Sequence, residues 1–379
     1  MRRRLLLVLV ALAVATPAEA AVDPPSSSAR AVLVATGAGE VLYERSAERE
    51  LPMASITKLM TAIVVLERKR PDDLMTVRET AAGVGESSVH LLVGEKLSVR
   101  DLLAAALIQS ANDAAFALAA GTAGSVSEFV GLMNVKARQL GLTHTHFVRP
   151  DGLDVPGHYS SAQDVLKLAR VAMKKPLVRR LVAMQSATIA GGRALFSWND
   201  LLGRYPGLIG VKTGHTDAAG WCEVAAARRD GVMIYTVVLG SPTRAQRNAD
   251  LARLLAWGQD FFGRLQVVST GHTYATSAIR LEEDRLPLVA ARPMRAVVRV
   301  DQPLVETVVA PALVAGPVEA GASLGEVRVE QKGRIIARVP LVAAREVEEP
   351  GLGHKLSWYS ERTLDEASDL LETVFGSIL

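Results

Sequence analysis

Apolar residues recur at strand spacing near the start of the chain, at helical spacing through its middle, and at strand spacing again beyond that. The first apolar segments, residues 31–35 and 40–44, flank the turn Thr36-Gly37-Ala38-Gly39 and predict an antiparallel hairpin. From about residue 55 to residue 174 the period is helical. Helices are predicted to begin at Ser98, which forms a capping-box pattern with Asp101, near Asn112, at about Ser127, and at Ser160 or Ser161.

Strand patterning returns after these helices. Residues 208–212, 220–227 and 232–239 predict strands, and Asp230-Gly231 supplies the turn between the last two. A long helix is predicted to follow over residues 243–262. This order is typical of an α+β domain whose first and last strands pair in one antiparallel sheet, and we assign it to residues 21–263.

Beyond residue 263 the helical period disappears, and short β-branched segments alternate with proline and glycine. The clearest of these segments, residues 295–300, 306–309 and 326–339, predict a smaller all-β domain over residues 264–350. From Leu356 the pattern becomes helical again, with acidic residues on the polar side, and predicts an amphipathic C-terminal helix in residues 351–379.

The first twenty residues have the three parts of a secretory signal peptide. Arg2, Arg3 and Arg4 precede an apolar run over residues 5–15, and Ala18-Glu19-Ala20 provides a small-x-small cleavage site. The run is shorter than a helix that spans a bilayer, which favours a cleaved signal over a retained anchor. Residues 1–20 are therefore predicted to direct export and to be removed.

Composition narrows the class of protein further. The chain has 379 residues, 49% of them hydrophobic and 22% charged, which is typical of a folded globular protein and excludes disordered and collagenous chains. The one cysteine, Cys222, permits neither an internal disulfide nor a CxxC motif. Cleavage of the signal removes three of 43 basic and one of 40 acidic residues, which leaves a net charge of +1. No nucleic-acid partner is expected at that charge without a basic run interleaved with aromatic residues.

Ser55-Ile56-Thr57-Lys58 is the first motif that can carry chemistry, and an apolar helical pattern follows it. Residues at i and i+3 share a helix face, so the Ser55 hydroxyl and the Lys58 amine can meet. A serine needs an adjacent base to act as a nucleophile, and a buried lysine of lowered pKa can be that base. Taken alone, the motif favours an N-capping serine with an exposed lysine.

Two further motifs become informative in combination with the first. Ser110-Ala111-Asn112 lies in the break between two predicted helices, where a hydroxyl and a carboxamide can point into a cleft. Lys212-Thr213-Gly214 ends a predicted strand and offers a cation, a hydroxyl and a position without a side chain, where a ligand backbone can approach. Each motif alone is also compatible with a helix terminus or a strand end.

SxxK, SxN and KTG in this order resemble the signature of the penicillin-recognising serine acyltransferases. Additional stretches resemble the low-molecular-mass D-alanyl-D-alanine carboxypeptidases, and the similarity covers essentially the whole mature chain. These stretches are Gly85-Glu86-Ser87-Ser88 with Gly94-Glu95, residues 129–134, Asp151-Gly152-Leu153-Asp154 and Lys212-Thr213-Gly214-His215-Thr216. The resemblance implies a β-lactamase/transpeptidase-like domain with a helical subdomain, a β-rich second domain and a terminal helix.

The resemblance also implies a role for each residue of the first two motifs. Ser55 is expected to attack the penultimate D-Ala carbonyl of a peptidoglycan stem peptide ending in D-Ala-D-Ala, with neutral Lys58 as base. Ser110 is expected to relay a proton to the departing D-Ala amine. Asn112 is expected to hold both the Lys58 side chain and the substrate amide.

The remaining predicted site residues bind the substrate. Lys212 and Thr213 are expected to meet its terminal carboxylate beside Gly214. The backbone N–H groups of Ser55 and His215 are expected to form the oxyanion hole. Arg247 lines up with an arginine that supports carboxylate binding in the family, although Arg244 is close by and both also fit a solvated helix face.

The resemblance implies a periplasmic serine-type D-Ala-D-Ala carboxypeptidase that is inhibited by β-lactam antibiotics and needs no metal or cofactor. A transpeptidase or endopeptidase would use the same residues with another acceptor or bond. A β-lactamase would need a carboxylate that drives deacylation, for which Asp151, Asp154 and Asp164 are the candidates. A non-catalytic scaffold would give no chemical reason for the three motifs to occur together.

Members of this family often rest a C-terminal helix on the outer face of the cytoplasmic membrane. Here the polar face of the predicted helix is acidic, so peripheral membrane contact would depend on apolar residues such as Leu371 and Phe375, with Trp358 and Tyr359 beside the helix. Docking of this helix on the β domain or on a partner is the alternative.

Overall fold

The computed structural model describes residues 7–14 and 23–360. They fall into two compact units. One unit comprises residues 22–260, and the other comprises the residues from 261 onward together with strand β1 (Leu7–Val14).

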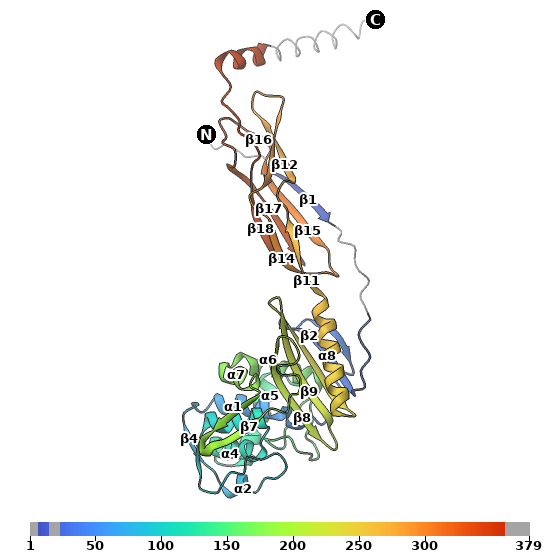
Figure 1. The fold of residues 1–379 in the computed structure, drawn as a ribbon, viewed down its shortest axis with the longest axis vertical. Helices are drawn as coiled ribbons and strands as arrows, with labels where there is room; N and C mark the ends of the chain where they lie inside the picture. The colour runs from blue at the N-terminus through green and yellow to red at the C-terminus, as the bar shows by residue number, and fades with distance from the viewer. Residues whose placement is uncertain (1–6, 15–22, 361–379) are drawn as a thin grey trace. The chain divides into compact units, whose positions relative to one another are not determined.

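The unit of residues 22–260 is built on a five-stranded antiparallel sheet (Figure 1). Its first strand, β2, pairs with its last, β10, as the sequence predicts. Every residue of β2 is buried, because Leu33 and Ala35 face the helical layer while Val34 on the opposite face packs against Gly258 of helix α8. In sheet order the strands are β3 (Val41–Arg45), β2 (Ala31–Thr36), β10 (Val232–Ser241), β9 (Gly220–Arg229) and β8 (Leu208–Thr216), and α8 spans Arg244–Asp260.

Helices between β3 and β8 form the second layer, and three of them begin at serine caps. Ser98, Ser125 and Ser161 each accept a hydrogen bond from the backbone N–H three residues on, which satisfies an otherwise unpaired donor of the first turn. The helices are α1 (Lys58–Leu66), α2 (Glu79–Ala82), α3 (Val99–Ala104), α4 (Asn112–Ala123), α5 (Val126–Gln139), α6 (Ala162–Lys174) and α7 (Pro176–Val182).

Two short antiparallel strand pairings in this unit are absent from the sequence prediction, and only the second of them is a hairpin. They pair β4 (Leu74–Thr76) with β5 (Lys96–Ser98) and β6 (Ser186–Ile189) with β7 (Arg193–Phe196). With three or four residues each, these strands are too short to show a period.

None of the described helices alone is long and apolar enough to cross a membrane. Helices α4 and α5 meet the length and hydropathy criteria only when they are taken together, and the pair is bent by 87°.

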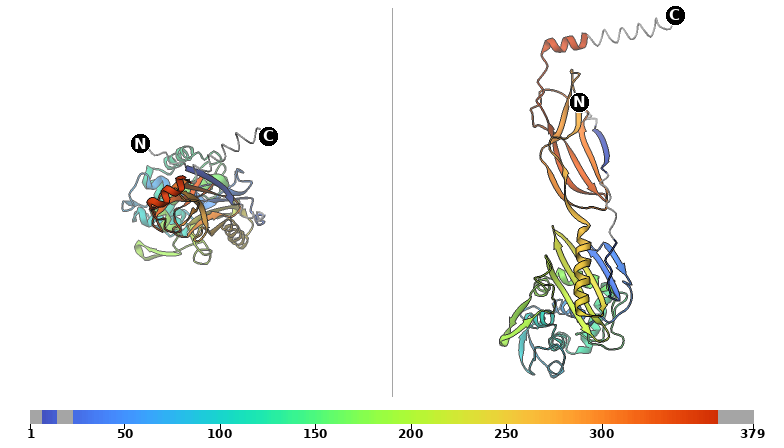
Figure 2. Two further views of the ribbon diagram at one scale, coloured as in Figure 1. Left: turned by 90° about the horizontal axis from the view of Figure 1, so that it is seen from above. Right: turned by 45° about the vertical axis from the view of Figure 1, so that its right-hand side comes forward.

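The second unit has its own apolar core and consists mainly of strands. A seven-stranded sheet has the order β1-β15-β17-β18-β13-β12-β16, and β11 pairs with β14. The predicted segment 326–339 is two strands, β17 and β18, that turn at Lys332-Gly333. The bounds are β11 (Phe262–Val268), β12 (Thr273–Ile279), β13 (Arg285–Ala290), β14 (Met294–Arg299), β15 (Leu304–Pro311), β16 (Leu313–Val314), β17 (Ser323–Gln331) and β18 (Arg334–Ala343). Figure 2 shows these strands mainly in orange.

Both predicted terminal segments are described only in part. Of the predicted signal peptide, residues 7–14 form β1, which pairs antiparallel with β15, and the other residues lie outside the described range. Cleavage after Ala20 would therefore leave β15 at the edge of its sheet. Of the predicted C-terminal helix, residues 352–360 are helical and residues 361–379 lie outside the described range.

Candidate active site

A cavity of about 250 Å³ in the unit of residues 22–260 brings the three sequence motifs together. Two of the predicted residues, Lys58 and Lys212, are buried just behind its wall and touch lining residues. The other seven predicted site residues line the cavity: Ser55, Ser110, Asn112, Thr213, Gly214, His215 and Arg247. The lining also includes Glu86, Ser87, Leu153, Trp198 and Trp221.

Ser55 and Lys58 lie at the start of the buried helix α1. A short 3-10 turn, η1 (Ala54–Thr57), leads into it, so both side chains fall on one side of the chain. Because almost every residue of α1 is apolar and packed in the core, the Lys58 side chain is fully buried as well. The Lys58 amine reaches the Ser55 hydroxyl, with 2.7 Å between Nζ and Oγ.

The Lys58 amine has two further partners, both of them acceptors. Its Nζ lies 2.8 Å from Oδ1 of Asn112 and 2.8 Å from the carbonyl oxygen of Asp151. Burial lowers the pKa of Lys58 to about 8, with the charge of Asp151 acting in the opposite direction. A neutral amine has two protons and one lone pair, so these two acceptors leave the lone pair available to the Ser55 hydroxyl.

Asp151 has a buried carboxylate, and its backbone carbonyl is one of the two acceptors that hold the Lys58 amine. Arg149 donates two hydrogen bonds to the carboxylate, at 2.8 Å each. Burial opposes ionisation of Asp151, but the Arg149 hydrogen bonds and the charge of Lys58 outweigh it and lower the pKa overall. Asp151 therefore stays charged, and its backbone carbonyl is fixed against Lys58.

Ser110 is held in an unusual backbone conformation. A π-helical turn, η2 (Ala105–Gln109), ends there, and Ser110 adopts φ 64°, a left-handed conformation that non-glycine residues rarely take. The next residues tie the motif to the loop across the cavity, since the Asn112 backbone N–H donates to Ser87 O and its Nδ2 donates to Gly85 O. The strain is thus fixed by surrounding hydrogen bonds, as is common at functional sites.

Lys212, on β8, crosses beneath the cavity to Ser110. Its amine donates to Oγ of Ser110 at 3.0 Å and to the carbonyl of Thr213 at 2.8 Å. Burial, together with the nearby charge of Lys58, holds the pKa of Lys212 well below the ordinary lysine value. Each of the two buried lysines thus contacts one serine of the cavity, Lys58 contacting Ser55 and Lys212 contacting Ser110.

Gly214 lines the cavity and has, in addition, a close contact that the sequence does not indicate. The backbone that passes close to it belongs to the chain itself: a Cβ at this position would lie 2.9 Å from the Ser55 nitrogen and 3.0 Å from the Met53 carbonyl. Any side chain there would push the nucleophile loop off β8. Gly214 therefore sets the distance between Ser55 and the KTG strand.

Aromatic rings form the wall beyond Gly214. The His215 imidazole stacks on Trp221 with 4.0 Å between ring centroids. Arg244 lies over both Trp198 and Trp221, at 5.3 and 5.9 Å from the ring centres. Arg244 also donates two hydrogen bonds to the Asp200 carboxylate, so an ion pair stabilises this wall in addition to the packing of its rings.

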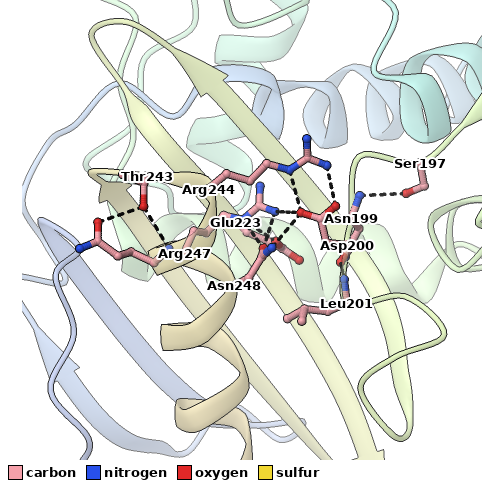
Figure 3. Close-up of polar contacts among 10 residues, drawn as sticks. Ser197, Asn199, Asp200, Leu201, Glu223, Thr243, Arg244, Arg247 and Asn248 are labelled. Atoms are coloured by element: carbon pink, nitrogen blue, oxygen red, sulfur yellow. Dashed lines mark hydrogen bonds and ion pairs between the residues drawn. The ribbon is translucent and has the colours of Figure 1, made fainter.

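Arg247 lies in a group of charged side chains that includes Glu223, Asp200 and Arg244 (Figure 3). Although it lines the cavity, its side chain is only 1% exposed. It forms ion pairs with Glu223 at 3.1 Å and with Asp200 at 3.3 Å, and it donates to Oδ1 of Asn248. Burial raises the pKa of Glu223 to about 7, partly offset by the charge of Arg247.

The carboxylates considered for a β-lactamase reaction have other partners. Asp151 is paired with Arg149, Asp154 accepts from Thr216 and Ala218, and Asp164 accepts from the His144 backbone. None of these three lines the cavity, whereas Glu86 does. No short motif includes Glu223, Asp200 or the two tryptophans that line the cavity, so the sequence alone does not predict them.

The fold and the cavity define a serine acyl-transfer enzyme, with an alcohol, a lysine base and a KTG strand around one cleft. Comparison with known proteins is consistent with this class. The family model for D-alanyl-D-alanine carboxypeptidase matches residues 17–243, and the chain belongs to this family. It is a serine-type carboxypeptidase.

Relatives resemble the chain over most of its length. The D-alanyl-D-alanine carboxypeptidase DacC of Escherichia coli is 32% identical over 88% of this chain and 88% of its own. Penicillin-binding protein 5 of Haemophilus influenzae is 27% identical, covers 86% of this chain and 100% of its own, and has a TM-score of 0.62. Penicillin-binding protein D2 of Listeria monocytogenes, in its ampicillin-bound form, is 36% identical over 62% of this chain and 99% of its own, with a TM-score of 0.57.

Proposed function

We propose that the chain removes the terminal D-Ala from peptidoglycan stem peptides ending in D-Ala-D-Ala, through an acyl-enzyme on Ser55. The observation that carries this proposal is the 2.7 Å contact between Ser55 and a buried Lys58 whose two remaining contacts are acceptors. Such a lysine can take the Ser55 proton without an external base.

In the acylation step, Ser55 Oγ bonds to the carbonyl carbon of the penultimate D-Ala while its proton passes to Lys58 Nζ. The bond from that carbon to the nitrogen of the last D-Ala then breaks, and the proton taken up by Lys58 passes through Ser110 to the departing amine, which leaves Lys58 neutral again. Asn112 holds both Lys58 and the substrate amide. Water hydrolyses the resulting ester, restores the Ser55 hydroxyl and releases the shortened peptide.

The substrate carboxylate is proposed to bind beside Thr213, between the charges of Lys212 and Arg247. Arg247 and Thr213 both line the cavity, and Lys212 is buried directly behind it. The backbone N–H groups of Ser55 and His215 are proposed to stabilise the oxyanion that forms during attack. Gly214 keeps these two residues close together.

β-Lactam antibiotics are proposed to acylate the same serine, because a cyclic amide presents a similar carbonyl to Ser55. The ampicillin-bound Listeria relative supports this proposal. The test is incubation of the mature protein and a Ser55→Ala variant with a fluorescent penicillin. We expect stable label on the parent and none on the variant, together with release of free D-Ala from a stem pentapeptide.

Other results of that experiment would indicate other functions. Rapid loss of the label would indicate a β-lactamase, and absence of label would indicate a non-catalytic scaffold. Transfer of the acyl group to an added amine in preference to water would indicate a transpeptidase, and cleavage of cross-linked dimers would indicate an endopeptidase.

We propose that residues 1–20 direct export to the periplasm, that residues 21–263 form the catalytic domain and that residues 264–350 form a β-rich domain. For residues 351–379 we propose an amphipathic helix that touches the outer face of the cytoplasmic membrane through its apolar side. Intact-mass measurement is expected to place the mature N-terminus at Ala21. Deletion of the residues after Pro350 is expected to shift the protein from the membrane to the soluble fraction, and an unchanged distribution would exclude anchoring.

A further inference from the structure

Glu223 is a buried carboxylate close to the cavity that the mechanism above does not use. It lies on β9 directly opposite Thr213 of β8, and opposite residues of an antiparallel pair project on the same face of the sheet. The Glu223 side chain is fully buried, whereas Thr213 lines the cavity. Glu223 therefore lies beneath the place proposed for the substrate carboxylate.

The contacts of Glu223 are unusual for a buried carboxylate. Neither of its oxygens accepts a hydrogen bond of good geometry, although buried carboxylates ordinarily accept several. Its close partner is Arg247, at 3.1 Å, and the Asn199 side chain lies beside it. Arg247 in turn has one surface toward the cavity. Glu223 thus acts on the cavity through Arg247.

Four charged groups surround Glu223. Arg247 and Arg244 come from α8, Lys212 from β8, and Asp200 from the segment between β7 and β8. When Glu223 is ionised, its charge and that of Asp200 offset those of the two arginines, and Lys212 lies beside them. Protonation of Glu223 adds one positive charge to this group, next to the proposed carboxylate position.

We propose that Glu223 is a positioning residue that sets the affinity of Arg247 for the substrate carboxylate: ionised, it competes for Arg247, and protonated, it leaves Arg247 to the substrate. The inference rests on the proposed function, because it needs a substrate that ends in a carboxylate. By reciprocity, a bound carboxylate favours protonation of Glu223, so substrate binding takes up a proton.

The charge of Glu223 changes in a pH range in which binding can be measured. The pKa of Glu223 is raised to about 7, chiefly by burial, so its charge changes near neutrality. Substrate affinity is therefore expected to strengthen as pH falls through about 7. The neutral form of Lys58 is favoured in the opposite direction, above about 8, so binding and acylation have opposite pH dependences.

The test separates binding from catalysis by using a Ser55→Ala variant, which binds without turnover. An N-acylated peptide ending in D-Ala-D-Ala is titrated calorimetrically between pH 6 and 9, in buffers of different ionisation enthalpy. We expect proton uptake near pH 7 and tighter binding at lower pH. In the double variant with Glu223→Gln, uptake is lost, and at pH 8.5 the peptide binds about fivefold or more tightly than to Ser55→Ala alone, the lower end of ordinary coupling between two sites.

A second variant separates Glu223 from the histidine that lines the cavity. His215→Gln in the Ser55→Ala background is expected to keep the proton uptake. Uptake that persists without Glu223, uptake that disappears with His215→Gln, or binding without any uptake would each overturn the inference while leaving the carboxypeptidase function intact. The absence of peptide binding together with absence of D-Ala release by the parent protein would overturn both. If Glu223→Gln fails to fold, the pH at which uptake by Ser55→Ala is centred decides the question: uptake centred near 7 supports Glu223, and uptake centred near 8, where Lys58 changes charge, overturns the inference.

Discussion

Lys58 meets three polar atoms, and only one of them can give it a proton. Asn112 Oδ1 and the Asp151 carbonyl are acceptors, while the Ser55 hydroxyl can donate. The pattern is fully satisfied by a neutral amine. It also explains why a lysine with no exposed surface is useful here, since burial favours the form that acts as a base.

The pH dependence of acylation follows from this arrangement. The pKa of Lys58 is about 8, so the base is neutral above that pH and protonated below it. The rate of labelling by a fluorescent penicillin, which is measured under single-turnover conditions, is expected to fall about tenfold per pH unit well below 8 and to level off above it. A rate that does not change between pH 6 and 9 would exclude Lys58 as the base.

Gly214→Ala tests the contact that positions Ser55. The new Cβ would meet the Ser55 nitrogen, the Ala54 Cβ and the Met53 carbonyl at 2.9–3.0 Å, so the nucleophile loop must shift. We expect acylation to slow by about 100-fold, the scale of a 1 Å misplacement. Gly131→Ala is the matched control, because a Cβ at Gly131 on α5 meets nothing within 4 Å and adds roughly 0.5–1 kcal/mol of stability. Equal acylation rates in both variants would contradict the close contact.

The short motifs in the sequence predict which residues meet at the cavity. They do not predict the charged residues that lie behind those motif residues. Ser55, Lys58 and Lys212 belong to short patterns with a stated chemistry, and the structure brings them together. Asp200 and Glu223 are 23 residues apart in the sequence and meet only because Arg247 lies between them. No local pattern in the sequence indicates such a contact.

At the scale of elements, long periodic segments and cap residues were predictable and short strands were not. The hairpin of β2 and β3, the helices that begin after Ser98 and Ser161, and the order of β8, β9 and β10 follow from periodicity and turn residues. The β6–β7 hairpin has four residues per strand and is fixed by tertiary contacts, including the hydrogen bond from the Phe196 backbone N–H to Gln109. Its existence depends on neighbours that the local sequence does not reveal.

The cap of α5 gives a prediction for one element. Ser125 accepts a hydrogen bond from the Glu128 N–H at 3.1 Å and donates to the Glu128 carboxylate. Ser125→Ala is expected to lower the free energy of unfolding by about 1 kcal/mol, measured by urea denaturation. Ser127→Ala, an exposed position two residues on in the same helix, is expected to leave it unchanged or slightly higher. A loss in both variants would indicate that the cap is not the cause.

His158 connects the loop after α5 to the start of η1, and it does so as a neutral ring. Thr57 donates to the Ala54 carbonyl, so the Nε2–H of His158 donates to Thr57 Oγ1, and its Nδ1 accepts from the Val148 N–H. A proton on Nδ1 would break the last bond. Burial is the main reason that the pKa of His158 is lowered to about 4.

The stability of this unit is therefore expected to depend on pH through His158. The unfolded state takes up the proton near pH 6.5 and the native state only near pH 4, so the stability contributed by the neutral ring is present above 6.5 and is lost as pH falls toward 4. Thermal or urea unfolding is expected to show a loss of roughly 3 kcal/mol over that window. His158→Gln is expected to reduce this slope, and an unchanged slope would assign the pH dependence to other groups.

At the scale of the whole molecule, each of the two units has an apolar core, but the residues of the candidate active site lie in only one of them. The residues that line the cavity all lie between Ser55 and Arg247, within the unit of residues 22–260. That unit and the β-rich unit have separate apolar cores. The catalytic residues therefore depend on packing within the unit of residues 22–260.

Removal of the residues after Asp260 tests this dependence. The truncated chain keeps both faces of the five-stranded sheet covered, since α8 ends at Asp260 and packs on β10 within the same unit. We expect it to fold and to be acylated by fluorescent penicillin within about twofold of the parent rate, as for a domain that folds by itself. Ser55→Ala in the truncated chain is the control for specific labelling. A truncated protein that unfolds cooperatively but is acylated far more slowly than the parent would mean that the β-rich unit shapes the cavity, and the catalytic residues would then not depend on one unit alone.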